Sequence, residues 1–451
     1  MLPKAFDAFL QQRPVAVMAR AVVERFFQPE RLDALFERTA EKQYRRTLLF
    51  SSVVELMHSV VLGVEPSVYA AYRRRRPALG VTDQAVYDKI DGTELGLSAA
   101  LVSDSARLAA PVIDALNARR DPWLPGYRTR ILDGNHLAAT EHRLAALRAT
   151  WAAPLPGRAL VVMEPDTGLA TDVFLTPDGH ASERSLLDDV LRTVRERDVW
   201  VADRNFCTLK FLCGIAGEKA FFIIRQHGTV KGELHGKRRF LGEGSTGQVY
   251  EQQIDLTFDG ETRTFRRLTV ELREPTRDGD MVLHLLSNLP ADIAGLLLAE
   301  LYRKRWLIET LFYDVTQTLS CEIDTLCYPR AALFVFCLAL MAANAVAVLK
   351  AALRAAHGAE VADELSGYYM ALEIKQAHDG MMIALPPAEW HVFGAMSATA
   401  FARALKDMAT RVDLAMHRKS RRGPKKPPPE MDTYKNGGHV STHKLLTAKD
   451  P

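Results

Sequence analysis

Residues 302–319 read YRKRWLIETLFYDVTQTL, and their polar positions fall into register only on a helix. At about 100° per residue, Tyr302, Arg305, Glu309 and Thr316 fall within an arc of about 60°. A broader apolar arc can pack against a sheet while the polar stripe faces a cleft; it contains Leu307, Ile308, Leu311, Val315 and Leu319. The alternative is an ordinary surface helix, stabilised by roughly 0.2–0.5 kcal/mol through the Arg305–Glu309 pair.

The size and composition are typical of an ordinary globular protein. A chain of 451 residues is too long for one compact core and indicates roughly two to four domains. Charged residues make up 25% and hydrophobic residues 48%, with a net charge of +3. Residues 73–76 are four arginines, and residues 418–426 are almost wholly basic. Such clusters are either solvated faces or local contacts for a polyanion.

The cysteines and the apolar segments indicate the compartment. Five cysteines without C-x-x-C spacing predict reduced thiols in a cytoplasmic protein rather than a zinc site. The N-terminal residues lack the apolar core of a signal peptide. Residues 331–349 are apolar except for Asn344 and are long enough to cross a bilayer. Their many alanines, and the lack of a second span, favour a buried helix of the core and no membrane partner.

Residues 1–125 have a helical pattern and are predicted to form a DNA-binding region. Residues 46–62 are its most regular apolar stretch. Residues 66–76 and 82–90 form two helices around a break at 77–80, with Thr82 or Asp83 as the cap of the second helix. With four arginines at the joint, this could be a helix-turn-helix in which Arg74 and Arg75 contact DNA. Helical hairpins with basic ends are also common, so a merely structural pair stays open.

From residue 127 the pattern changes to short strands. Residues 130–133 form a strand that ends at Asp133, and residues 160–164 and 169–175 form a hairpin around a turn at 165–168. An amphipathic helix follows at 182–197, then a strand at 199–202 that runs into Asp203, a helix at 208–217 and a strand at 220–225. We assign residues 126–228 and 290–355 to the two parts of one α/β core.

The segment between these parts, residues 229–289, is predicted to be an inserted β-subdomain. Turn signals at 259–260 and 278–279 separate strands at 248–258, 262–272 and 281–286. The sequence GEGSTG at 242–247 invites a phosphate-loop interpretation, but Gln248 and Val249 stand where that loop needs Lys and Ser or Thr. A hairpin loop is predicted there instead.

The C-terminal region is predicted to be helical, and its tail is assigned no fold. Residues 356–416 hold two helices, near 359–378 and 398–416. The tail at 417–451 is basic and Pro-rich, and it is either a solvated extension or a segment that lies along a phosphate backbone.

Three carboxylates are predicted to meet. Asp133 and Asp203 each follow a strand, and ligands of open α/β sheets bind beyond such strand ends. If the two strands are parallel neighbours, both side chains lie in one cleft, and Glu309 joins them from its helix. Three carboxylates repel each other unless cations offset their charge. Hard oxygen ligands favour Mg²⁺ or Mn²⁺, and two such ions about 3.5–4 Å apart can serve a phosphoryl transfer.

These residues carry a resemblance to a known family. Asp133 in ILDGNHLAATEHRL, Asp203 in VWVADRNF and Glu309 in YRKRWLIETLF resemble the signature regions of DDE-type insertion-sequence transposases of the IS-four branch. The branch signature is Tyr, two residues, Arg, three residues, Glu, six residues, Lys, and Thr316 stands here in place of the Lys. The resemblance implies an RNase H-like mixed sheet flanked by helices, with an inserted β-subdomain.

The resemblance also implies an activity. Asp133, Asp203 and Glu309 would hold Mg²⁺, for which Mn²⁺ can substitute, in a transposase that cleaves and joins DNA. Tyr302 and Arg305 would contact a DNA phosphate. The partners implied are double-stranded DNA, as transposon ends and as target, and a second copy of the chain in a homodimer.

Other contacts and other activities stay open. Arg204 and Asn205 are either further DNA contacts or structural residues, and Lys304 or Lys210 could replace the missing lysine. A nuclease without strand transfer and a DNA-binding descendant without catalysis are the alternative functions.

Overall fold

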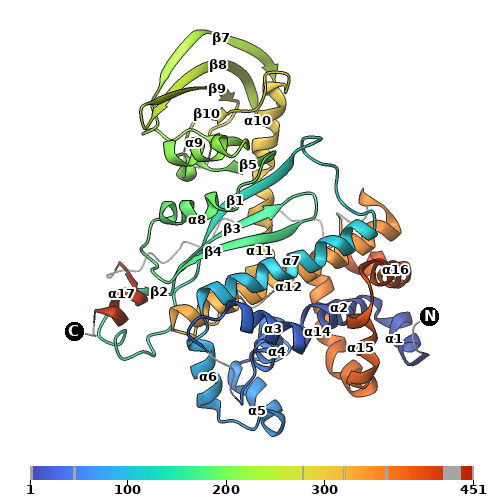
Figure 1. The fold of residues 1–451 in the computed structure, drawn as a ribbon. Coiled ribbons are helices and arrows are strands. Elements are labelled where there is room, and N and C mark those ends of the chain that lie inside the picture. The colour runs from blue at the N-terminus through green and yellow to red at the C-terminus, as the bar shows by residue number, and fades with distance from the viewer. Residues whose placement is uncertain are drawn as a thin grey trace.

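The computed structural model describes residues 4–43, 47–276, 279–317, 319, 321–360, 364–419 and 438–448. Its fold is α/β: one large mixed sheet stands over a layer of helices (Figure 1). The predicted fold class, an RNase H-like mixed sheet flanked by helices, is confirmed.

The N-terminal part is helical, as its apolar periodicity predicted. Thr82 caps the second helix of the predicted pair by accepting a hydrogen bond from the Ala85 N–H. Gly80, with φ of +63°, ends the first helix in the left-handed conformation that glycine adopts freely. The helices are α1 (Asp7–Gln12), α2 (Pro14–Phe26), α3 (Pro29–Thr39), α4 (Phe50–Val61), α5 (Val68–Leu79), α6 (Asp83–Asp91) and α7 (Leu95–Ala115).

Nine of the described strands form one sheet of order β4-β3-β1-β5-β6-β10-β9-β8-β7. The pairs β1–β5 and β5–β6 are parallel, so the strands that precede the two aspartates are parallel neighbours as predicted. The strand bounds are β1 (Arg128–His136), β3 (Arg158–Glu164), β4 (Leu169–Thr176), β5 (Asp198–Ala202), β6 (Phe221–Arg225), β7 (Glu233–Glu243), β8 (Gly247–Phe258), β9 (Glu261–Leu272) and β10 (Val282–Ser287).

The segment predicted as an insertion continues the core sheet. β10 pairs with β6 on one side and with β9 on the other, and β7 to β9 extend the sheet to its upper edge (Figure 1). Residues 242–247 span the end of β7, the turn at 244–246 and the start of β8, and the Gly244 N–H donates to the Gly247 carbonyl. The hairpin-loop prediction is therefore right, and the phosphate-loop interpretation is excluded.

Two predicted helix boundaries are wrong. The helix predicted at 182–197 is a short 3-10 turn, η2 (Glu183–Leu186), followed by α8 (Leu187–Leu191). The chain turns before β5, because Arg197 has a φ of +66° and Asp198 accepts a hydrogen bond from the Arg195 N–H. The helix predicted at 302–319 is split into α10 (Gly295–Arg303), the 3-10 turn η4 (Lys304–Trp306) and α11 (Leu307–Gln317).

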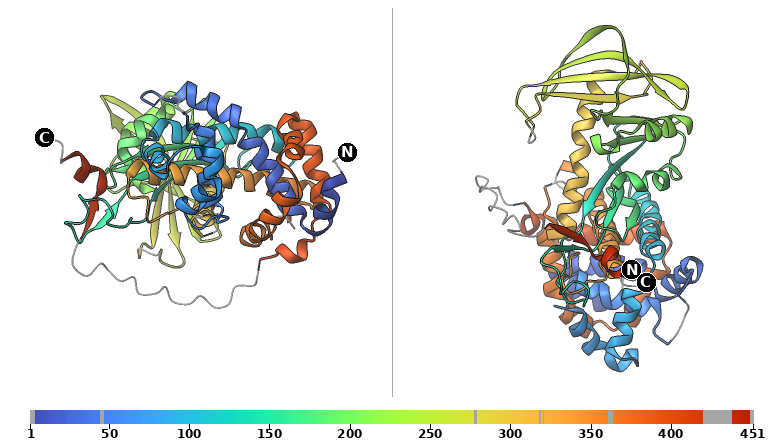
Figure 2. Two further views of the ribbon diagram at one scale, coloured as in Figure 1. Left: turned by 90° about the horizontal axis from the view of Figure 1, so that it is seen from below. Right: turned by 90° about the vertical axis from the view of Figure 1, so that its left-hand side faces the viewer.

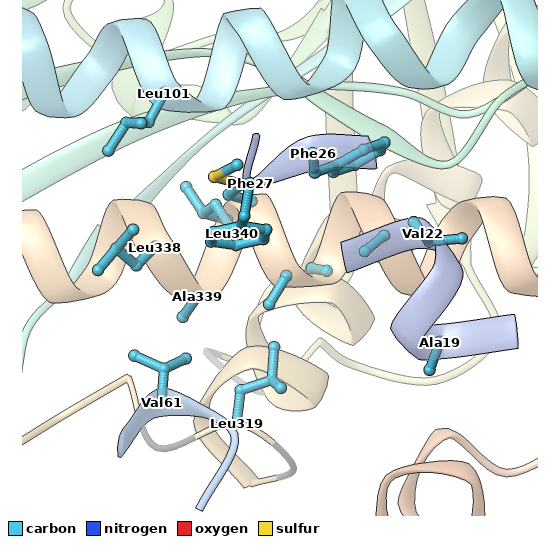
Figure 3. Close-up of a cluster of buried hydrophobic side chains, with 14 of the residues drawn as sticks. Ala19, Val22, Phe26, Phe27, Val61, Leu101, Leu319, Leu338, Ala339 and Leu340 are labelled. Carbon is cyan, nitrogen blue, oxygen red and sulfur yellow. The ribbon is translucent and has the colours of Figure 1, made fainter. Parts of the chain in front are cut away.

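The apolar segment at 331–349 is a core helix. It lies within α12 (Pro329–His357), and 94% of its most apolar window is buried inside the protein. Its one polar residue, Asn344, donates to the Ala170 carbonyl and to Ser105 Oγ, and its Oδ1 accepts from the Ala170 N–H. Figure 3 shows Leu340 of this helix packed with Phe26 and Phe27. The segment is buried by the rest of the protein, and its polar side chain is hydrogen-bonded inside it. Both observations favour a core helix over a membrane span.

The C-terminal region differs from its prediction. The first predicted helix is displaced to α14 (Gly367–Ala384), α15 (Pro387–Ala395) follows, and α16 (Ala398–Ala409) ends early. β11 (His439–Ser441) pairs with β2 (Ala153–Leu155), and α17 (Thr442–Thr447) lies at the end of the molecule opposite the N-terminus (Figure 2). Most of the basic run at 418–426 lies outside the described residues.

A buried histidine of α4 makes the fold sensitive to acid. Burial lowers the pKa of His58 from 6.5 to about 3, and its ring lies 4.0 Å from the Phe27 ring between centroids. Below pH 6.5 the unfolded chain therefore binds a proton that the folded chain rejects until about pH 3. The stability that His58 contributes is lost as the pH falls through this window.

We predict that His58→Leu flattens the pH dependence of stability. Between about pH 7.5 and pH 5 the wild type should lose about 2 kcal/mol that the variant keeps, since one pKa unit corresponds to about 1.36 kcal/mol. Calorimetric melting at both pH values measures the difference. His391→Leu, at an exposed histidine of α15, is the matched control. Equal slopes for His58→Leu and wild type would contradict the assignment.

Candidate active site

Two strands and one helix place the three predicted carboxylates in one site. Leu132 of β1 and Ala202 of β5 are register partners. Asp133 and Asp203 directly follow these two residues, so they lie at the same level of the sheet. The strand was predicted to end at Asp133. Instead, β1 continues to His136 and pairs with β3 over these residues. Glu309 comes from the first turn of α11, which packs against β1.

Arg305 lies at the centre of this site. It is placed by η4, the 3-10 turn that interrupts the predicted helix, and its side chain is 10% exposed. Its Nη1 donates to Asp133 Oδ2, and its Nη2 lies 3.6 Å from Glu309 Oε1. One guanidinium thus contacts two carboxylates and offsets part of their charge, and its bond to the nearly buried Asp133 is the pairing that buried charges require.

The pKa of Asp133 shows which groups share the site. Burial raises it from 3.8 to about 6, while Arg305 lowers it and the negative charges of Asp203 and Glu309 raise it. The Gly134 N–H donates to Asp133 Oδ1 and favours the charged form. Asp203 and Glu309 therefore both lie near enough to Asp133 to disfavour its charged form.

Tyr302 and Arg204 border the site differently. Burial raises the pKa of Tyr302 to about 12, so its phenol is a neutral hydrogen-bond donor beside Arg305. Arg204 points outward: its Nη1 lies 3.7 Å from Asp280 Oδ2, which Arg225 also contacts. Asp203 uses Oδ1 to accept the Asn205 N–H at 2.7 Å, which caps the 3-10 turn η3 (Arg204–Phe206).

The donor set suits a hard divalent cation. Carboxylate oxygens are the ligands that Mg²⁺ and Mn²⁺ prefer, and Asp133, Asp203 and Glu309 would supply them. Within the described residues, no three His, Cys, Asp or Glu side chains already form a group that could hold an ion. Arg305 contacts Asp133 and Glu309 instead, so a cation that bound these two carboxylates would have to displace this guanidinium.

Comparison with known families agrees with this geometry. Residues 124–345 match the family model of the transposase DDE domain. The chain belongs to the DDE-type transposases. No curated protein matches the chain. All residues predicted for the core site, from Asp133 to Glu309, lie inside the matched range of this transposase.

The position of the missing signature lysine contributes no cation. Thr316 turns its hydroxyl to its own helix and donates to the Phe312 and Tyr313 carbonyls at 3.0 and 3.2 Å. Neither suggested replacement lies at the site. Lys304 Nζ lies over the Trp123 ring at 5.6 Å, and Lys210 Nζ pairs with Asp188 at 2.6 Å.

The N-terminal arginines are arranged differently from the prediction. Arg74 pairs with Glu65 at 2.9 Å and Arg75 with Glu55 at 3.0 Å, so both predicted DNA contacts already have carboxylate partners. Arg73 and Arg76 are exposed on the same helix, α5, and neither has an ion-pair partner among the described residues. The following helix, α6, carries acidic residues on its surface, which disfavours it as a recognition helix.

Sequence reasoning missed one side chain at the site. Glu183 of η2 accepts a hydrogen bond from Asn205 Nδ2 and lies against Gly134, next to both aspartates. The sequence pattern predicted one continuous helix at 182–197. On such a helix nothing directs the Glu183 side chain toward the two aspartates. The only sequence signal is the glycine directly after Asp133, which permits a close approach.

Removal of Arg305 should favour a cation in the DNA-free protein. In Arg305→Ala, Mn²⁺ no longer competes with a guanidinium for Asp133 and Glu309. We expect Mn²⁺ to raise the melting temperature of this variant more than that of wild type, since each tenfold gain in affinity adds about 1.4 kcal/mol at saturation. Arg303→Ala, whose exposed side chain pairs with Glu300, is the control. An equal Mn²⁺ effect in Arg305→Ala and wild type would show that Arg305 does not occupy the cation's place.

The two unpaired arginines of α5 should carry the DNA contact of this region. We expect Arg73→Ala with Arg76→Ala to weaken DNA binding and to reduce the slope of log affinity against log salt by about 2, one per phosphate contact. Arg74→Ala with Arg75→Ala is the matched pair and should change the slope less. Fluorescence anisotropy at several salt concentrations measures both. The reverse order would restore the original assignment.

Proposed function

We propose that this transposase is encoded by a bacterial insertion sequence and acts on the ends of that element. It binds the terminal inverted repeats, cuts a DNA strand at each end and joins the freed 3′-hydroxyl to target DNA. The observation that supports this most is the meeting of Asp133, Asp203 and Glu309 around Arg305 inside the DDE domain. Clustered carboxylates supply the oxygen ligands that the divalent ions of a phosphoryl-transfer site need.

The residues of the site divide the work. Asp133, Asp203 and Glu309 would hold Mg²⁺, or Mn²⁺ in its place, and a pair of such ions supplies an activated oxygen nucleophile and stabilises the leaving oxygen. Arg305 then exchanges Asp133 for a DNA phosphate, which it binds through charge-assisted hydrogen bonds. Tyr302 stays protonated and donates to the same backbone.

The partners and the compartment follow from this function. The substrate is double-stranded DNA, as element ends and as target, and a homodimer brings two ends together. Basic residues outside the core, such as Arg73 and Arg76, add phosphate contacts that do not depend on sequence. We propose a cytoplasmic protein without a membrane partner, because α12 is used inside the core.

One observation favours a second candidate function. Thr316 leaves the position of the signature lysine without a charge, and neither Lys304 nor Lys210 fills it. A DNA-binding descendant that has lost catalysis would tolerate this loss. Incubation with end-containing DNA and Mg²⁺ separates the functions: joined products indicate a transposase, cuts without joining a nuclease, and binding alone the inactive descendant.

Glu309→Gln should separate catalysis from binding. The change removes a charged oxygen ligand but no phosphate contact, so we expect cleavage to fall by at least about 100-fold. Binding to the element ends should stay within about twofold, because the phosphate contacts that dominate affinity are kept. Glu218→Gln, at the exposed end of α9 (Leu209–Gly217), is the control and should leave both unchanged. Parallel loss of binding and cutting in Glu309→Gln would count against the assigned role.

A further inference from the structure

The strand that carries Asp133 is supported from behind by a side chain without an assigned role. Successive residues of a strand face opposite sides of the sheet, so Asp133 faces Arg305 and Gly134 faces away. A Cβ atom at Gly134 would lie 2.2 Å from Glu183 Oε1 and 2.6 Å from Glu183 Cδ. The carboxylate of Glu183 therefore rests directly on the backbone next to Asp133.

The other oxygen of Glu183 reaches the loop of the second aspartate. Asn205 Nδ2 donates to Glu183 Oε2, and the Asn205 N–H donates to Asp203 Oδ1 at 2.7 Å. Arg184, the next residue along, donates from Nε to the Asn205 carbonyl at 2.7 Å. Asn205 is thus held through its side chain, its N–H and its carbonyl, and Asp203 is held with it.

The carboxylate of Glu183 is not used by its own helix. Ser182 caps η2 by accepting the Arg184 N–H, so the turn does not need Glu183. The side chain is only 11% exposed, and the ion pair found for it among the described residues is with His136 at 3.7 Å. Burial lowers the pKa of His136, which makes that histidine a weak source of positive charge. A nearly buried acid with so little compensation is costly to the fold unless its position serves another purpose.

We propose that Glu183 is a positioning residue for the DNA reaction, which ties the strand of Asp133 to the loop of Asp203 and so sets the separation of these two carboxylates. The inference rests on the proposed function of the site. Glu183 touches neither carboxylate directly; it acts through Gly134 and Asn205. Partners of this kind behind metal-binding side chains typically change metal affinity or activity by about 10–100-fold when they are removed.

The test compares Glu183→Ala and Glu183→Gln in the full chain. For Glu183→Ala we expect both Mn²⁺ affinity and single-turnover cleavage of end DNA to fall by about 10–100-fold. Mn²⁺ affinity is measured without turnover, from the electron paramagnetic resonance signal of the free ion. End binding and the melting temperature should stay near wild type. Glu183→Gln keeps an acceptor for Asn205 and should restore most of both losses.

Gly134→Ala provides a second, independent variant. Its Cβ would collide with Glu183, so the single change should displace the strand and reduce Mn²⁺ affinity at least as strongly as Glu183→Ala. With Glu183→Ala in the same chain the collision is gone, so the double variant should be no worse than Glu183→Ala alone. Asp189→Ala, which breaks an exposed pair with Arg192 in the following helix, is the control and should match wild type.

Several results would overturn the inference. Wild-type Mn²⁺ affinity in Glu183→Ala would show that the contact does not set the site, and equal losses in Glu183→Gln would show that charge matters rather than the contact. A large fall in melting temperature with loss of end binding would make Glu183 a residue of the fold. If wild type bound Mn²⁺ and cut DNA while Glu183→Ala behaved identically, the proposed function would stand and this inference alone would fail. If wild type did neither, both would fail.

Discussion

The repulsion among three carboxylates is the constraint around which the core is built. Asp133, Asp203 and Glu309 come from two strands and a helix that are far apart in the sequence, and the charges of Asp203 and Glu309 disfavour the charged form of Asp133. Arg305 makes their meeting tolerable, because it bonds to Asp133 and lies 3.6 Å from Glu309. The break between α10 and α11 belongs to the same arrangement, since the residue that pairs with Asp133 sits in the 3-10 turn itself.

How much of this was readable from the sequence depended on whether a feature was local. Period and turn residues predicted β5 up to Asp203, the hairpin of β3 and β4, and the buried helix α12. They could not predict the turn at Lys304–Trp306, because residues 304–306 contain neither Gly nor Pro and the contact that accompanies it is tertiary. For the same reason the ion pairs of Arg74 and Arg75 could not be predicted, because Glu65 and Glu55 reach them from other segments.

The continuous sheet links the predicted insertion to the site. β10 pairs with β6, and β6 pairs with β5, the strand that leads to Asp203. Asp280, just before β10, lies between Arg225 at the end of β6 and Arg204 beside Asp203. The outer strands are therefore joined through hydrogen-bonded neighbours to the segment that holds one of the acids. A separately folded insertion on flexible links would not have this property.

Asp133 is held by two contacts of different kinds: an ion pair with Arg305, and the packing of Glu183 on the adjacent Gly134. This difference suits a site in which DNA and metal ions replace some of the protein's own contacts. In front of the strand, Arg305 forms a charge pair, and a phosphate or a cation can replace either member of such a pair. Behind the strand, Glu183 packs on Gly134 and accepts a hydrogen bond from Asn205, on the side of β1 that faces away from Arg305. Exchange of the Arg305–Asp133 pair can therefore change the charge balance of the site. The contacts of Glu183 hold the backbone of Asp133 in place meanwhile.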